Sequence, residues 1–135
     1  MKKIFYLIFL SILTNGCAWL DESEHQKIIG QYVIGWNDLE SNRAITKEIT
    51  ENNYHTIVSN YVYAVGHNES YIIAKQHQNF NTETNYYLID INKNKDDSSK
   101  GIHGPLNETE FEKIKKKLNI ESLDFDMNFN DKANN

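Results

Sequence analysis

The sequence has one cysteine and lacks an apolar run long enough to cross a bilayer. A single cysteine, Cys17, excludes a disulfide bond within the chain, so the fold must rest on its own core. The apolar run at residues 4–13 is about half the roughly 20 residues that a membrane-spanning helix needs. We therefore do not expect this run to remain as a transmembrane anchor.

Basic residues are scarce relative to acidic ones. Without Lys2 and Lys3, 12 of the 14 basic residues remain against 19 acidic residues, which gives a net charge of −7. Nucleic acids and anionic lipid headgroups attract positively charged surfaces. This balance argues against binding either of them through bulk charge, and we expect no nucleic-acid partner.

Motifs for catalysis and metal binding are missing as well. No histidine pair has the i, i+4 spacing of a metal-binding helix, and no Gly-x-Ser-x-Gly motif occurs. Asp96 and Asp97 lack the spacing of oxygen ligands around a glycine that a calcium loop requires. The histidines are interpreted as scattered, solvated residues: His25, His55, His67, His77 and His103. The sequence predicts a protein that is not an enzyme, with no catalytic residue, metal site or cofactor.

What the sequence does have is an N-terminal export signal. Lys2 and Lys3 form a basic start, the apolar run follows, and Gly16-Cys17 comes directly after it. This order resembles the lipobox of bacterial lipoproteins, in which the signal is cut before the cysteine and the thiol then carries diacylglycerol. We predict lipidation of Cys17, with acyl chains such as palmitate holding the domain at the cell envelope, outside the cytoplasm.

An ordinary secretion signal is the alternative. Thr14 and Asn15 stand where the lipobox usually has leucine and a small residue, whereas Gly16 and Ala18 would suit cleavage after Ala18. A lone cysteine in an exported protein is either a free thiol or a modified one. The position of Cys17 at the cleavage site favours lipidation.

The length of the chain suits one domain and is too short for two. We predict a signal peptide at 1–16, the lipidated cysteine and a polar tether at 17–27, a single domain at 28–126, and a frayed polar tail at 127–135.

Within the domain, short runs rich in β-branched and aromatic residues predict strands. These runs lie at residues 28–36, 43–50, 55–65, 70–78 and 85–91. The turn-forming residues 66–69 predict a hairpin between two of them, and the polar residues 92–100 predict an exposed loop that continues through 101–105.

A helix at 108–118 follows the predicted loop. Asn107 and Glu110 have the spacing of a capping box, and Leu106 and Phe111 have that of a hydrophobic staple. The apolar stripe consists of Phe111, Ile114 and Leu118, and Asn119 suits the position just after the helix. The predicted fold is therefore α+β: a single antiparallel β-meander of about five strands packed on one C-terminal helix.

Several of these segments together resemble a known family. They are Gly30-Gln31-Tyr32, Tyr61-Val62-Tyr63-Ala64, residues 71–76, residues 86–90, and Gly104-Pro105-Leu106 leading into the helix of Phe111. Over roughly residues 28–120 the chain is similar to a family of small bacterial lipoproteins catalogued as domain of unknown function 3997. The resemblance implies a lipoprotein and supplies no activity.

Tyrosine is the one residue type that suggests a binding surface. Tyr61 and Tyr63 are expected to share a face of the 55–65 strand, where they would form a platform for a peptide, glycan or protein. Packing against neighbouring strands is the competing interpretation of the same rings.

The sequence thus favours an exported, lipid-anchored envelope lipoprotein whose domain binds a partner or has a structural role. The alternative is a lipoprotein immunity protein or inhibitor that holds a toxin or enzyme at the membrane, for which acidity and exposed tyrosines are suitable. An enzyme is the least favoured class. The expected partners are the membrane, through the lipid, and a protein or peptide of unknown identity.

Overall fold

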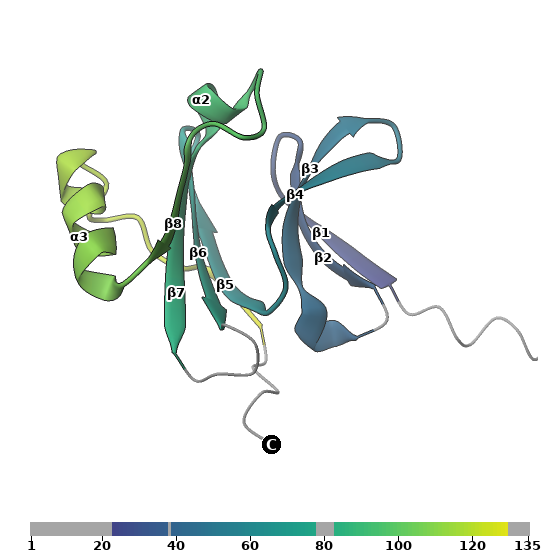
Figure 1. The fold of residues 1–135 in the computed structure, drawn as a ribbon, viewed down its shortest axis with the longest axis horizontal. Helices are drawn as coiled ribbons and strands as arrows, with labels where there is room; N and C mark the ends of the chain where they lie inside the picture. Colours follow the sequence, from purple (N-terminus) through teal and green to yellow (C-terminus); the bar gives the residue numbers. More distant parts are fainter. Residues whose placement is uncertain (1–22, 38, 78–82, 130–135) are drawn as a thin grey trace, which may run out of the picture.

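Two antiparallel sheets form the domain in the computed structural model, which describes residues 23–37, 39–77 and 83–129 (Figure 1). The first sheet has the order β1-β2-β3-β4. Its strands are β1 (Ser23–Ile29), β2 (Tyr32–Asn37), β3 (Ala44–Thr50) and β4 (Asn53–Val58). The second sheet has the order β8-β7-β6-β5-β9. Its strands are β5 (Val62–His67), β6 (Tyr71–His77), β7 (Thr84–Asp90), β8 (Ile102–Leu106) and β9 (Met127–Asn128).

Three short helical segments complete the described chain: η2 (Glu40–Asn42), α2 (Ile91–Asn94) and α3 (Glu108–Lys117). Antiparallel strands and the helix near residues 108–118 were expected. The single five-stranded meander was wrong, because the described residues form nine strands in two sheets and the fold is mainly β. None of the described helices is long and apolar enough to cross a membrane.

The first error lies in residues 28–36, which form a hairpin and not one strand. Ile29 pairs with Tyr32, so Gly30 and Gln31 make a two-residue turn. Gly30 has φ +56°, a conformation that costs glycine little and that tight hairpins need. Hydrophobicity alone does not distinguish a continuous strand from two strands joined by so short a turn.

The second error lies in residues 55–65, which are divided between the two sheets. β4 ends at Val58, and β5 begins at Val62, where the backbone N–H donates to the carbonyl of Arg43 at 3.0 Å. Tyr61 has φ +71°, so the chain changes direction immediately before β5. This connection carries the polypeptide from the first sheet to the second.

The main core lies between the two sheets. Ile34 and Ile45 are opposite each other on β2 and β3, and both are almost fully buried. Ile72 and Ile89 pair in the same way on β6 and β7 and belong to the same apolar cluster. Each sheet therefore buries one face against the other sheet.

A second core lies on the far side of the second sheet. Ile73 and Leu88 pair on β6 and β7 and contact Phe111 of α3, which is 1% exposed. In Figure 1, α3 lies beside the second sheet, on the side away from the first sheet. Because successive residues of a strand point to opposite faces, Ile72 and Ile73 serve different cores.

The ends of α3 agree with the sequence prediction. The side chain of Asn107 accepts from the N–H of Glu110, and the carboxylate of Glu110 accepts from the N–H of Asn107, which completes the capping box. At the other end, Asn119 has φ +55°, and the N–H of Ile120 donates to the carbonyl of Lys115 at 3.0 Å. Leu106 also packs in the cluster of Phe111, as a hydrophobic staple requires.

Residues 92–105 contain more structure than expected. Asn94, in the predicted exposed loop, is fully buried at the end of α2. Residues 102–106 form β8, which pairs with β7 and thereby covers an edge of the second sheet. A polar sequence misled the prediction here because Asn94 satisfies its polar atoms by hydrogen bonds inside the protein.

The boundaries of the domain also differ from the prediction. β1 begins at Ser23, so the last residues of the predicted tether belong to the first sheet. Met127 and Asn128, placed in the frayed tail, form β9 and pair with Val65 and Ala64. The predicted signal peptide and Cys17 lie outside the described residues.

Candidate functional site

The two tyrosines singled out in the sequence do not form one platform. Val62 pairs with Gln76 and Ala64 pairs with Lys75, so Tyr63 is an extra residue in a β-bulge. The ring of Tyr63 stacks on His77, with 4.3 Å between ring centroids, and its hydroxyl is 2.7 Å from Oγ1 of Thr84. The prediction that Tyr61 and Tyr63 share a strand face was wrong, because Tyr61 precedes the strand and the bulge interrupts the alternation.

Tyr61 instead lines a hollow at the connection between the sheets, which we call the corner hollow. Its volume is about 330 Å³. Its lining residues are Ser59, Asn60, Tyr61, Gln76, His77, Asn85, Tyr87 and Pro105. They come from the β4–β5 connection, from the end of β6, and from β7 and β8.

Hydrogen bonds fix the wall of the corner hollow. Nε2 of Gln76 donates to the carbonyl of Ser59 at 2.9 Å and lies 3.2 Å from its hydroxyl. Nδ2 of Asn85 donates to Oε1 of Gln76 at 3.4 Å. The N–H of His77 donates to the carbonyl of Tyr61 at 3.1 Å. The connection is thereby tied to β6, which gives a preformed shape to the site.

Burial raises the pKa of Tyr87 above its ordinary value. Its hydroxyl therefore stays protonated over a wider pH range than that of a solvated tyrosine. A protonated phenol both donates and accepts hydrogen bonds, which suits recognition of a polar, uncharged group.

A second hollow lies on the outer face of the first sheet, and we call it the sheet trench. Its volume is about 280 Å³. Its lining residues are His25, Gly35, Trp36, Asn37, Asn42, Ala44, Thr46, Thr56 and Asn60.

Small side chains form the floor of the sheet trench. His25 pairs with Gly35, Gly35 pairs with Ala44, and Thr46 pairs with Thr56 across neighbouring strands. A Cβ atom at Gly35 would lie 2.4 Å from Nδ1 of His25 and 2.6 Å from the carbonyl oxygen of Glu24, so larger residues do not fit. The absence of a side chain at this position lets the neighbouring strand approach and keeps the floor low.

One polar atom in the sheet trench has no internal partner. Oγ1 of Thr46 is buried and makes no hydrogen bond within the part of the chain that the structure describes. A buried hydroxyl without a partner is costly, by about 1–3 kcal/mol.

The two hollows share an unusual chemistry. Within the described part of the chain, neither lining contains Asp, Glu, Lys or Arg, although these residues make up 24% of the sequence. The polar groups are carboxamides, hydroxyls, phenols, imidazoles and the indole of Trp36. Such groups recognise uncharged polar ligands through hydrogen bonds and ring contacts.

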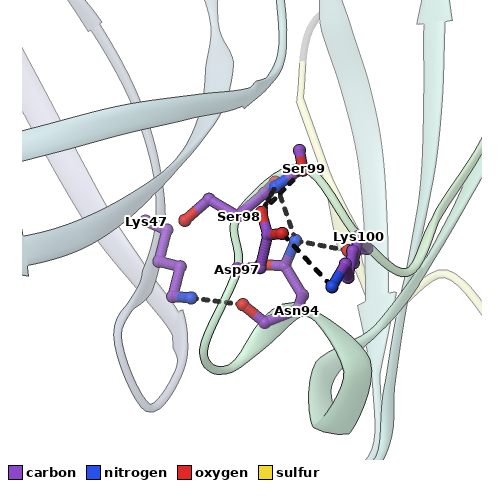
Figure 2. Close-up of polar contacts among 6 residues, drawn as sticks. All are labelled: Lys47, Asn94, Asp97, Ser98, Ser99 and Lys100. Atoms are coloured by element: carbon purple, nitrogen blue, oxygen red, sulfur yellow. Dashed lines mark hydrogen bonds and ion pairs between the residues drawn. The ribbon is translucent and has the colours of Figure 1, made fainter.

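The third notable polar cluster is a structural clasp between the sheets (Figure 2). The ammonium group of Lys47, on β3, donates to the backbone carbonyls of Asn94 and Lys95, the latter at 2.8 Å. Oδ1 of Asn94 accepts from the hydroxyl of Tyr32 at 2.7 Å, and its Nδ2 donates to the carbonyls of Ser98 and Lys100. Figure 2 shows the side chain of Lys47, from β3, pointing at Asn94 at the end of α2.

The groups of the clasp are already engaged with one another. Lys47 is 3% exposed and Asn94 is 0% exposed. The partners of Lys47 are carbonyls near the C-terminal end of α2, where cations are favoured. We therefore assign the clasp to stability, as the link between β3 and the segment after β7.

The histidines do not come together as a metal site. Within residues 23–37, 39–77 and 83–129, there is no group of three or more His, Cys, Asp or Glu side chains suited to hold a metal ion. The ring of His25 stacks on Tyr54, with 5.9 Å between ring centroids, at the outer face of the first sheet.

A scan of protein families identifies the relationship of this chain. Residues 29–130, more than half of the chain, match the family described as Protein of unknown function (DUF3997). The chain belongs to this family. Membership confirms the resemblance that the sequence suggested and assigns no activity. No curated protein and no solved structure matches this member of DUF3997.

Most lining residues of the corner hollow and the sheet trench were missed at the level of sequence. Asn60, Gln76 and Asn85 are distant in sequence and carry no motif. The one available signal was Ser59-Asn60, two turn-forming residues inside an otherwise strand-like run.

Proposed function

We propose that this chain is an exported, lipid-anchored envelope protein whose domain is a non-enzymatic binding module. The corner hollow is the observation that supports a binding role: it is concave, preformed and lined by uncharged hydrogen-bonding groups. The N-terminal signal with Cys17 supports the envelope location and the lipid anchor.

The position of the first strand is consistent with a domain close to the membrane surface. Cys17 and Ser23 are separated by five residues. A chain advances at most about 3.6 Å per residue, so this tether reaches roughly 20 Å at full extension. A lipid on Cys17 would keep the first sheet within that distance of the bilayer.

A binding test uses the full chain purified from membranes in a zwitterionic detergent and immobilised for capture from envelope extract. Asn85→Asp places a carboxylate in the corner hollow, and Asn92→Asp makes the same change at an exposed position of α2. We expect the wild type and Asn92→Asp to retain the same ligand and Asn85→Asp to lose most of it. Equal retention by all three proteins would contradict the assignment of the site.

The immunity or inhibitor alternative is favoured by one feature, the net charge of −7 without the two signal lysines. Acidic surfaces attract basic proteins, and that attraction weakens as salt screens it. Retention of a basic protein that survives Asn85→Asp and is lost at about 0.5 M salt would support this alternative over the corner hollow.

A further inference from the structure

We infer that the corner hollow and the sheet trench form one strip that binds a neutral glycan chain. This inference rests on the proposed binding function and specifies the class of its ligand. Asn60 lines both hollows, so they meet at the β4–β5 connection and are not two isolated sites. A ligand longer than a single sugar would contact both.

The first argument is the absence of formal charge along the strip. Among the residues that the structure describes, no Asp, Glu, Lys or Arg lines either hollow, although the chain is rich in them. A phosphate, carboxylate or ammonium group of a ligand would meet no counter-ion among these lining residues, although its desolvation requires one. A neutral ligand avoids this cost.

The second argument is the kind of polar group that the strip provides. Carboxamides such as Asn60 and Asn85 carry two donors and one acceptor oxygen on a planar group, which matches pairs of sugar hydroxyls. The lining of the strip also includes the aromatic residues Trp36, Tyr61 and Tyr87. Sugars present an apolar C–H face as well as hydroxyls, so rings and amides together suit them.

An extended peptide fits the strip less well than a glycan. Peptides commonly bind by adding a strand to an exposed sheet edge, where backbone groups are free. The sheet trench crosses the face of the first sheet from β1 to β4, and the backbones of these strands already pair with one another. Only side chains are available on that face.

The test is calorimetric titration of the detergent-solubilised full chain with neutral linear oligosaccharides of glucose or N-acetylglucosamine, as disaccharides and hexasaccharides. A detergent without a sugar headgroup is required. We expect the hexasaccharide of at least one series to bind about tenfold more tightly than its disaccharide, because only the longer chain reaches both hollows.

Two substitutions locate the binding. Asn60→Asp, at the junction, should weaken hexasaccharide binding by about tenfold or more, whereas Asn92→Asp should not. Melting temperatures of both variants show that each is folded.

The outcomes separate this inference from the proposed function. Failure of both hexasaccharides to bind at millimolar concentration, or equal binding by Asn60→Asp and the wild type, overturns the glycan strip. A neutral decapeptide serves as a second probe: peptide binding that Asn60→Asp abolishes would retain the binding function and reject the glycan. Capture from envelope extract that Asn85→Asp abolishes likewise leaves the binding function intact when no glycan binds.

Discussion

At the scale of single residues, the domain places polar groups in buried positions and satisfies most of them. Lys47, Asn94 and Tyr32 form one hydrogen-bonded clasp that joins β3 and β2 to the segment after β7. Thr46 and His67 are the described residues with a buried side-chain atom that lacks a partner.

The clasp predicts a pH dependence of stability. Burial, and secondarily the negative charge of Asp90, raise the pKa of Tyr32 above its ordinary value. The folded state therefore holds this proton more tightly than the unfolded state. The contribution of Tyr32 to the free energy of unfolding is fully present below the pKa of an unfolded tyrosine, near 10. It is lost as the pH rises through the higher pKa of the folded state.

We expect the urea midpoint of the full chain to fall between about pH 9.5 and 11.5, with a smaller fall in Tyr32→Phe. Tyr32→Phe should also be less stable at pH 7, by about 1–2 kcal/mol, because Oδ1 of Asn94 loses its donor. Tyr54→Phe, at an exposed tyrosine, is the control, and its urea midpoint should fall with pH as steeply as that of the wild type. Identical slopes in all three proteins would refute the assignment to Tyr32.

At the scale of elements, the sequence predicted structure correctly where the stabilising contacts join residues close together in the chain. The capping box at Asn107 and the left-handed Asn119 define α3 through contacts within a few residues. The β5–β6 hairpin was likewise confirmed, with His67 paired to Ile72. The strand-like run 55–65 was misread because its division depends on a second sheet that lies far away in sequence.

The packing of α3 gives a prediction at this scale. Phe111 is buried between α3 and the second sheet, with 4.8 Å between its ring centroid and that of Tyr86. Phe111→Ala should lower the free energy of unfolding by about 3–5 kcal/mol, since it removes a large buried ring and leaves a cavity. Lys116→Ala, at an exposed site of the same helix, should be nearly neutral. Thermal unfolding followed by circular dichroism measures both, and equal small effects would mean that α3 does not stabilise the sheet.

At the scale of the whole molecule, the proposed lipid anchor would hold the proposed binding site near the membrane. The sheet trench lies over the first sheet, whose first strand follows Cys17 after five residues. A tether this short would restrict the ligands of the strip to those present near the membrane surface.

Lipidation of Cys17 is the prediction at this scale. Cys17→Ser should abolish incorporation of labelled palmitate and move the protein from the membrane fraction to the soluble fraction, or leave the signal uncut. Ser11→Ala, within the apolar run, is the control and should behave as the wild type. A Cys17→Ser protein that is processed at the same bond and stays membrane-bound would exclude the lipid anchor.

The sequence by itself determined the features that depend on neighbours along the chain: the capped helix with its buried stripe, the central hairpin, the predominance of strands and the family. Hydrogen bonds and turns of this kind form between residues a few positions apart, so their signals are readable locally. Only the tertiary structure decided that the strands divide into two sheets, that Asn94 is buried, and that Asn60 lines two hollows whose described lining residues are uncharged. These features depend on pairing and packing between distant segments, because a residue such as Gln76 or Thr46 acquires its surroundings only when the sheets come together.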